Sequence, residues 1–246
     1  MIIPEYSGEL PWLTAEQMSE VHRAMLHDYG IGPEQVMENA GRCLADLVRR
    51  RCLGGDPRGG RITVLAGSGG NGACAMVAVR RLRSWGSHVS VSIPRPVEKL
   101  EGPAGRQAKT IQAMDAAIEV GAPDAPRADD LVVDGLIGYA PDGPPRGLMV
   151  ELMEWANDQP APVLSVDVPS GLDGTSGVPS TLTVRATGTI ALGLPMAGLR
   201  RPEVREIVGE VYLGDISVPP ALYRRRLNLR VEPVFAEGEL FRLPLS

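Results

Sequence analysis

Short apolar runs alternate along the chain with segments of helical spacing, and this pattern predicts an α/β fold with a doubly wound, mostly parallel sheet. Two further observations support the prediction. The run 62–66 leads into a glycine-rich turn, and two other runs end in an acid, Asp134 and Asp167. Ligands of such sheets bind outside the carboxyl ends of the strands, where all these features fall.

The N-terminal segment shows clear local signals. Residues 1–12 are expected to form an extended arm, because two prolines disfavour a helix there. Thr14 and Gln17 have the spacing of a capping box, which predicts a helix over 15–29 that ends at Gly30. A second helix is expected after Pro33, where apolar residues recur at helical spacing.

The rest of the chain follows the same alternation, and strands and helices are predicted from apolar runs and helical spacing respectively. The predicted strands are 62–66, 89–93, 131–134, 162–167, 184–192 and 208–215, and the predicted helices are 73–85, 105–118 and 147–157. The chain of 246 residues shows no repeat and no obvious linker, so we predict a single domain over 1–246.

Composition and charge exclude several classes of function. The net charge of −5 gives no general attraction to nucleic acid or to an anionic membrane. No targeting segment and no membrane-spanning apolar run is visible. Cys43, Cys52 and Cys74 form no disulfide or zinc pattern, so a cytoplasmic protein is expected. His22 and His27 are too poorly aligned for a metal pair and are expected to face solvent.

The glycine-rich turn allows two interpretations. Gly67, Gly69 and Gly72 match the dinucleotide-binding pattern G-x-G-x-x-G, between a predicted strand and a predicted helix. The acid expected after the next strand is replaced by Pro94-Arg95-Pro96, and no lysine completes a P-loop. The alternative is a tight strand-to-helix turn that needs glycine only for its backbone geometry.

Oxygen-bearing side chains gather at the predicted strand ends. Asp134 and Asp167 end two strands, while Asn71 and Ser170 lie in the loops beside them. Each acid alone is equally well explained as a residue that caps a turn. Together, one carboxylate among neutral oxygens would suit a monovalent cation better than calcium.

These segments resemble the YjeF N-terminal domain family, the NAD(P)H-hydrate epimerases. The resemblance covers most of the chain, and its motifs are 13–18 (LTAEQM), 37–41 (MENAG), the glycine turn, 133–138 (VDGLIG), 165–173 (SVDVPSGLD), 193–199 (GLPMAGL) and 209–219 (GEVYLGDISVP). It implies a Rossmann-like three-layer αβα sandwich and interconversion of the R and S epimers of hydrated NADH or NADPH. It also implies a homodimer.

The resemblance implies a set of site residues. A potassium ion would be bound by Asn71, Asp134 and Ser170, and Asp167 would act as the general acid and base. The implied substrate contacts are Gly70, Asn71, Gly72, Ala73, Cys74, Gly138, Tyr139, Ala140, Pro141, Asp142, Gly143, Pro144 and Asp167. The family's usual dehydratase domain is not visible in the chain, so a separate hydrate dehydratase is the expected partner.

Both substrate loops depart from the family pattern. The family motif N-N-G-G-D-G is replaced by residues 70–75, in which Gly70 and Cys74 stand for the first Asn and for the Asp. Cys74 is either part of a small helix-forming run or a reactive thiol with a lowered pKa. The alternative function is therefore an inactive or repurposed module that binds a nucleotide-like ligand, a protein or RNA. Its only obvious basic patch, 224–226, is expected to be a solvated surface, so nucleic acid is not an expected partner.

Overall fold

An eight-stranded sheet forms the centre of the computed structural model, which describes residues 2–124, 129–139 and 143–245. The strand order is β3-β2-β1-β4-β5-β6-β7-β8, and neighbouring strands are parallel except for the antiparallel pair β7 and β8. The strands are β1 Arg61–Ala66, β2 His88–Ile93, β3 Ile118–Val120, β4 Leu131–Gly135, β5 Val163–Val166, β6 Gly188–Leu192, β7 Glu210–Gly214 and β8 Leu240–Leu243. The predicted α/β class is confirmed.

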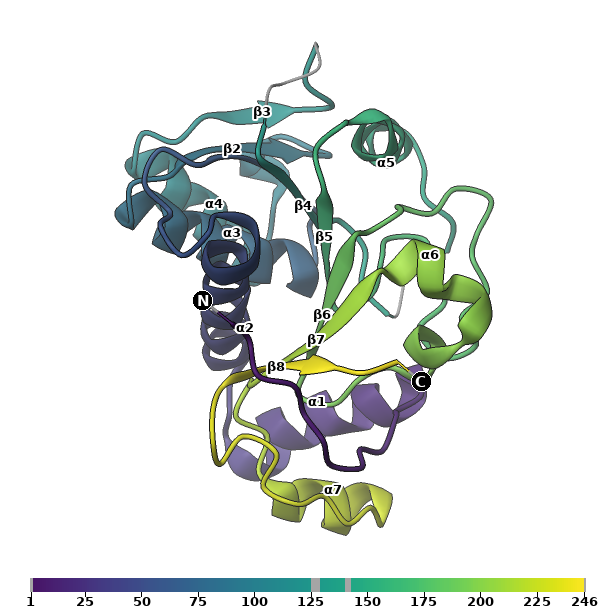
Figure 1. Ribbon diagram of the computed structural model, residues 1–246. Helices are drawn as coiled ribbons and strands as arrows, with labels where there is room; N and C mark the ends of the chain where they lie inside the picture. Colours follow the sequence, from purple (N-terminus) through teal and green to yellow (C-terminus); the bar gives the residue numbers. More distant parts are fainter. Residues whose placement is uncertain (1, 125–128, 140–142, 246) are drawn as a thin grey trace.

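Helices cover both faces of the sheet (Figure 1). One face carries α2, α3 and α4, the other carries α5 and α6, and α1 and α7 lie near the β7–β8 end. The helices are α1 Ala15–Tyr29, α2 Pro33–Leu47, α3 Gly70–Ser84, α4 Gly102–Ala113, α5 Leu148–Asp158, α6 Arg205–Val208 and α7 Pro220–Leu227. Within the described residues, no helix is both long and apolar enough to cross a bilayer.

The central strands are buried on both faces, which explains why they are apolar runs rather than alternating patterns. In β1, only Arg61 is exposed. Ile62 and Val64 pack into the cluster beneath α2, α3 and α4, while Leu65 packs into the cluster beneath α5. This double burial fixes the strand ends where the candidate residues lie.

The capping signals at the N-terminus are confirmed. The Thr14 side chain accepts a hydrogen bond from the Gln17 backbone, and the Gln17 side chain accepts one from the Thr14 backbone. Helix α1 ends at Gly30, which adopts a left-handed conformation with φ of 68°. The backbone N–H of Ala15 donates to the Thr175 hydroxyl, so the start of α1 is anchored to the loop after β5.

Several predicted boundaries are wrong. The predicted helix 105–118 ends at Ala113, and Ile118 instead begins the short edge strand β3. Only the second half of the predicted strand 184–192 forms β6, because Val184 bonds back to the loop carbonyl of Ser170. Helix α3 begins at Gly70 rather than at residue 73, so the glycine turn is itself the first turn of the helix. Helices α6 and α7 and strand β8 were not predicted from the sequence.

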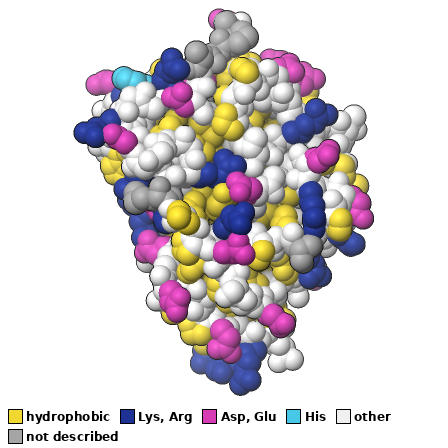
Figure 2. All heavy atoms as spheres, in the orientation of Figure 1, with side chains coloured by type: hydrophobic (Ala, Val, Ile, Leu, Met, Phe, Trp, Pro, Cys, Tyr) yellow, Lys and Arg dark blue, Asp and Glu magenta, His cyan; other side chains and the backbone are white. Residues whose placement is uncertain are grey.

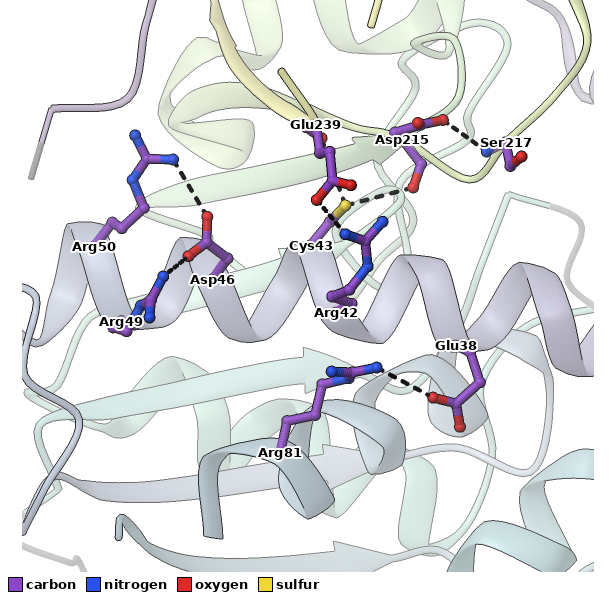
Figure 3. A network of polar contacts seen from close by, with 10 residues as sticks. All are labelled: Glu38, Arg42, Cys43, Asp46, Arg49, Arg50, Arg81, Asp215, Ser217 and Glu239. Atoms are coloured by element: carbon purple, nitrogen blue, oxygen red, sulfur yellow. Dashed lines mark hydrogen bonds and ion pairs between the residues drawn. The ribbon is translucent and has the colours of Figure 1, made fainter. Parts of the chain in front are cut away.

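Polar contacts tie α2 to its neighbours (Figure 3). Arg42 pairs with Glu239 ahead of β8, and Glu38 pairs with Arg81 on α3. The Cys43 thiol, on the inner side, donates to the Asp215 carbonyl at 3.4 Å. These contacts fix the position of α2, which forms one wall of the cavity described below.

The basic patch 224–226 lies exposed on α7, as Figure 2 shows at the lower end of the molecule. It is partly neutralised, because Arg226 pairs with Asp28 at 2.5 Å and Arg225 contacts the Tyr29 hydroxyl. The patch is therefore a solvated, partly paired helix surface, as expected from the sequence.

Candidate active site

A cavity of about 520 Å³ opens at the carboxyl ends of β1, β4 and β5 and is closed by α1 and α2. Its lining is mainly apolar, with methionine, leucine, isoleucine and valine side chains. The polar groups in the lining are His22, Arg23, Asn71, Tyr139 and Asp167. An apolar cavity with a few convergent polar groups is typical of a small-molecule site.

The glycines of the turn serve two purposes. A Cβ on Gly67 would lie 1.9 Å from the Leu136 carbonyl oxygen, and a Cβ on Gly72 would lie 1.9 Å from the Gly67 carbonyl oxygen. These two glycines are required for close backbone packing, which supports the interpretation as a tight turn. Gly69 and Gly70 instead line the cavity, where a Cβ on Gly70 would meet only the Met37 methyl, at 3.7 Å.

Asp167 follows β5 and lies against the cavity with only 4% of its surface exposed. Its backbone is left-handed, with φ of 68°. One carboxylate oxygen accepts a hydrogen bond from the Tyr139 backbone N–H at 3.2 Å. Burial raises the pKa of Asp167 to about 7, because this single hydrogen bond only partly offsets desolvation. Near neutral pH the carboxyl therefore exists in both protonation states.

Asp134 ends β4 and is surrounded by donors. Its carboxylate accepts hydrogen bonds from the Ser165 hydroxyl at 2.8 Å, the Ser170 hydroxyl at 2.6 Å and the Ser170 backbone at 2.9 Å. A fourth comes from the Leu136 backbone at 3.2 Å. Burial raises the pKa of Asp134, and these donors oppose the rise. Asp134 therefore organises the loops after β4 and β5 and lies outside the cavity lining.

Asn71 and Ser170 meet at the Ile137 carbonyl, and Asp134 adjoins them through its hydrogen bond from Ser170. The Ile137 oxygen lies 3.4 Å from both the Asn71 amide nitrogen and the Ser170 hydroxyl. The Asn71 amide also donates to the Val166 carbonyl at 2.7 Å. One carboxylate, one hydroxyl, one amide and two backbone carbonyls form a donor set that suits a monovalent cation. Among the described residues, no cluster of three or more His, Cys, Asp or Glu could hold a metal.

Cys74 lies in the first turns of α3 and contacts the cavity, but its side chain is buried. Burial raises the pKa of Cys74 to about 12, and the negative charge of Asp167 raises it further. The alternative of a reactive thiol with a lowered pKa is therefore wrong. Cys74 is a neutral, apolar part of the wall at neutral pH.

His22 was expected to face solvent, and this expectation is wrong. Its Nδ1 lies 3.0 Å from the Tyr139 hydroxyl, inside the cavity, and burial lowers its pKa. The sequence held a usable signal, because Met18 and Met25 lie four residues before and three after His22 and are both buried. His27, on the same helix, is exposed as expected.

The second predicted loop divides between two cavities. Gly138 and Tyr139 line the main cavity, whereas Gly143 and Pro144 line a shallower one of about 400 Å³ that Gly138 also borders. Gly72 and Ala73 are buried in α3 and do not line the main cavity. The predicted contacts Ala140, Pro141 and Asp142 lie outside the described residues.

The family model of the YjeF-related protein N-terminus matches residues 33–198. The chain belongs to this family.

Curated relatives in the YjeF-related family extend the likeness over nearly the whole chain. The NAD(P)H-hydrate epimerase of Dehalogenimonas lykanthroporepellens is 36% identical, over 95% of this chain and 93% of the relative. That of Rhodopirellula baltica is 32% identical, over 88% of each. The bifunctional NAD(P)H-hydrate repair enzyme of Thermofilum pendens is 34% identical, over 81% of this chain but only 39% of the longer relative.

A solved structure has the same fold. The crystal structure of the yeast protein YNL200c superposes with a TM-score of 0.78, covering 95% of this chain and all of the yeast chain, at 22% identity. The family match begins at residue 33, so α1, which carries His22, lies outside it. The family model therefore does not include the part of the cavity wall that α1 forms.

Proposed function

We propose that this chain is an NAD(P)H-hydrate epimerase that interconverts the R and S epimers of hydrated NADH and NADPH. The observation that carries the proposal is the buried carboxyl of Asp167, which lies against an apolar cavity and has its pKa raised to about 7. The names of the full-length relatives at 36% and 32% identity support the same activity. The intact cavity favours an enzyme over an inactive module.

The chemistry requires a group that can both give and take a proton. The hydroxyl-bearing ring carbon must lose water and regain it on the other face, and the departing hydroxyl needs a proton. A carboxyl with a pKa of about 7 is suited to this task at neutral pH. The apolar wall excludes bulk water, which strengthens the interaction between Asp167 and the ligand.

We further propose that Asn71, Asp134 and Ser170, with the carbonyls of Ile137 and Val166, would hold a potassium ion. The donor set fits once the Asn71 amide is turned, because its nitrogen donates to both carbonyls here and its oxygen would have to face the ion. Every ligand would then be an oxygen, and only the Asp134 carboxylate carries charge. When bound, the ion would supply a fixed positive charge beside the cavity. The hydrogen bonds of Asp134 would then hold the loops after β4 and β5 in place beside the ion.

Three further expectations belong to this proposal. A homodimer and a cytoplasmic location remain predictions, the second resting on cysteine usage. A hydrate dehydratase is the proposed partner, because several relatives are named bifunctional NAD(P)H-hydrate repair enzymes. The epimerase would then supply the epimer that the dehydratase consumes.

The direct test is to incubate the purified protein with one epimer of hydrated NADPH and follow its equilibration by chromatography. The wild type is expected to accelerate equilibration, and Asp167→Asn is expected to slow it by about 10²-fold or more. Asp173→Asn is the matched control, because Asp173 belongs to the same loop but bonds only to its own turn, at Thr175 and Ser176. A folded wild type with no rate above background would refute the proposal.

A further inference from the structure

The cavity contains a second polar centre, formed by His22 and Tyr139, besides Asp167. The imidazole Nδ1 and the phenol oxygen are 3.0 Å apart, and the two rings lie 5.9 Å apart with a tilt of 44°. Of the residues that line the cavity, those that titrate or carry charge are His22, Arg23, Cys74, Tyr139 and Asp167. Cys74 is held neutral by burial.

Tyr139 connects the two centres. Its backbone N–H donates to Asp167 at 3.2 Å, while its hydroxyl at the other end of the side chain contacts His22. Its Cβ packs against Gly174, where an added Cβ would lie 3.0 Å away. Tyr139 is thus fixed at its backbone, its Cβ and its hydroxyl, and it contacts Asp167 through its backbone and His22 through its hydroxyl.

Epimerisation by loss and return of water needs proton transfer on both faces of the ring. On one face, the carbon–oxygen bond breaks, the oxygen takes a proton from Asp167, and water leaves a planar ring cation. On the other face, a water molecule forms the new carbon–oxygen bond and must release a proton. Asp167 can give and take a proton at the face that it contacts, and a second group is needed for the proton released at the opposite face.

We propose that Tyr139, held by His22, is the second catalytic residue of the site and takes the proton of the incoming water. This inference rests on the proposed epimerase function. The phenol oxygen accepts the proton from water as it passes its own proton to the His22 imidazole. The cycle leaves Asp167 as a carboxylate and His22 as an imidazolium, and the reverse reaction, with the two roles exchanged, restores both. His22 acts through Tyr139 and is therefore a positioning residue and a proton reservoir.

The protonation states support these roles. Burial lowers the pKa of His22, so the imidazole is neutral and able to accept a proton at neutral pH. The Asp167 carboxyl is buried against the cavity and accepts a hydrogen bond from the Tyr139 backbone at 3.2 Å. The only fixed charge among the other described cavity residues is Arg23, which forms a 2.7 Å ion pair with Glu20 on the same helix. The acid and the base of the site are thus distinct groups.

The test compares Tyr139→Phe, His22→Leu and His22→Asn with the wild type. The Asn amide keeps a hydrogen-bond acceptor near Nδ1 but cannot take up a proton. We expect each variant to lower kcat by about 10²-fold, while NADP⁺ binds within about threefold of the wild type. Loss of the acidic limb of the kcat–pH profile in His22→Asn is expected as well, because that limb reports protonation of His22 and a structural defect would not remove it.

Matched controls are His27→Leu on the exposed side of α1 and Tyr29→Phe at its end, both expected to retain wild-type rates. Variants of His22 and Tyr139 with wild-type kcat, alongside an active wild type and an inactive Asp167→Asn, would overturn this inference and leave the epimerase intact. Full activity in His22→Asn would reduce His22 to a hydrogen-bond partner and overturn its proton-accepting role. An inactive wild type would refute the epimerase and this inference together.

Discussion

Asp167 combines two features that each cost free energy. Its backbone occupies the left-handed region, which disfavours most residues but is tolerated by Asp and Asn. Its carboxyl is buried with one backbone donor, in contrast to Asp134, which has four. Strain and poor solvation at one position are typical of functional sites. The contrast between the two acids identifies Asp167 as the reactive one.

This contrast predicts how stability depends on pH. The pKa of Asp167 is about 7 in the folded protein, whereas an ordinary solvated aspartate has a pKa of 3.8, so the unfolded chain loses its proton first. The folded state is therefore penalised progressively as pH rises from about 4 to about 7, and the penalty stays constant above that range. Asp167→Asn removes it and should raise the free energy of unfolding at pH 8 by up to about 4 kcal/mol.

Urea unfolding of both proteins at pH 5 and pH 8 measures the difference. The free energy of unfolding of Asp167→Asn should exceed that of the wild type by more at pH 8 than at pH 5. Asn fits the left-handed backbone and keeps an oxygen that accepts from the Tyr139 backbone, so other effects stay small. An advantage that does not grow between the two pH values would contradict the assignment of the raised pKa to Asp167.

Cys74 should be unreactive towards thiol reagents. Its pKa is raised to about 12 and its side chain is buried, whereas Cys52 is only partly buried. Iodoacetamide at pH 7.5, followed by peptide mass spectrometry, should label Cys52 at least about tenfold faster than Cys74, because the thiolate is the reacting species. Preferential labelling of Cys74 in the folded protein would restore the reactive-thiol alternative.

Sequence patterns located the acids but not their partners. Asp134 and Asp167 were predictable because an apolar run marks a buried strand and the acid marks its end. The His22–Tyr139 contact was not, since it joins residues 117 positions apart, and tertiary packing alone decides which face of α1 meets the loop. The differing pKa values of the two acids also depend on donors from the loops after β4 and β5 and from β5 itself.

At the scale of elements, the packing of α2 against α3 supports the cavity. A Cβ on Gly41 would lie 2.4 Å from the Val77 side chain and 2.7 Å from the Cys74 carbonyl oxygen. The backbone of α2 therefore packs directly against α3 at this point. Gly41 thus lets α2 approach the first turns of α3, where Asn71 and Cys74 lie. The separation of the two helices sets the width of the site.

Gly41→Ala should therefore damage both stability and activity. Overpacking of this kind costs about 1–3 kcal/mol, although alanine is the better helix former. Thermal unfolding and epimerisation rates of Gly41→Ala and of Gly30→Ala provide the comparison, because Gly30 has open space around its Cβ but a left-handed backbone. We expect both to lose stability and only Gly41→Ala to lose activity. Wild-type stability in Gly41→Ala would contradict the close approach.

Elements with strong local signals were predictable, and elements made by tertiary contacts were not. The capping box and Gly30 fixed both ends of α1. The edge strand β3 has three residues, and β8 pairs antiparallel to β7 after a long connection, so neither carries a distinctive pattern. The early start of α3 escaped notice because glycine is a poor helix former, whereas here backbone packing demands it.

At the scale of the molecule, the proposed potassium site would couple ion binding to folding. A ligand that binds only the folded state stabilises it by about 1.4 kcal/mol at ten times its Kd, which corresponds to a shift of about 4 °C for a domain of this size. The thermal unfolding temperature in KCl should be higher than that in LiCl at equal ionic strength. Ser170→Ala should abolish the difference, whereas Ser176→Ala, on the surface of the same region, should keep it. Equal unfolding temperatures for the wild type in both salts would contradict the site.

The fold class followed from the alternation of apolar runs and helical spacing, because that pattern reflects burial on both faces of a parallel sheet. The closure of the cavity by α1 did not follow, because α1 precedes the first strand and packs at the far, β7–β8 end of the sheet. Periodicity shows where a helix lies in the chain. It does not show which strands a helix that precedes the sheet will cover at their carboxyl ends.

The anchoring of α1 has a consequence for the order of folding during synthesis. Its start bonds to Thr175, and Leu13 pairs with the segment at Pro195 and Met196. The docking surface of α1 is synthesised some 160 to 180 residues after α1 itself. The nascent chain therefore holds an incomplete pocket until late in translation. The amphipathic helix that carries His22 stays undocked until then, and its apolar face is open to premature association.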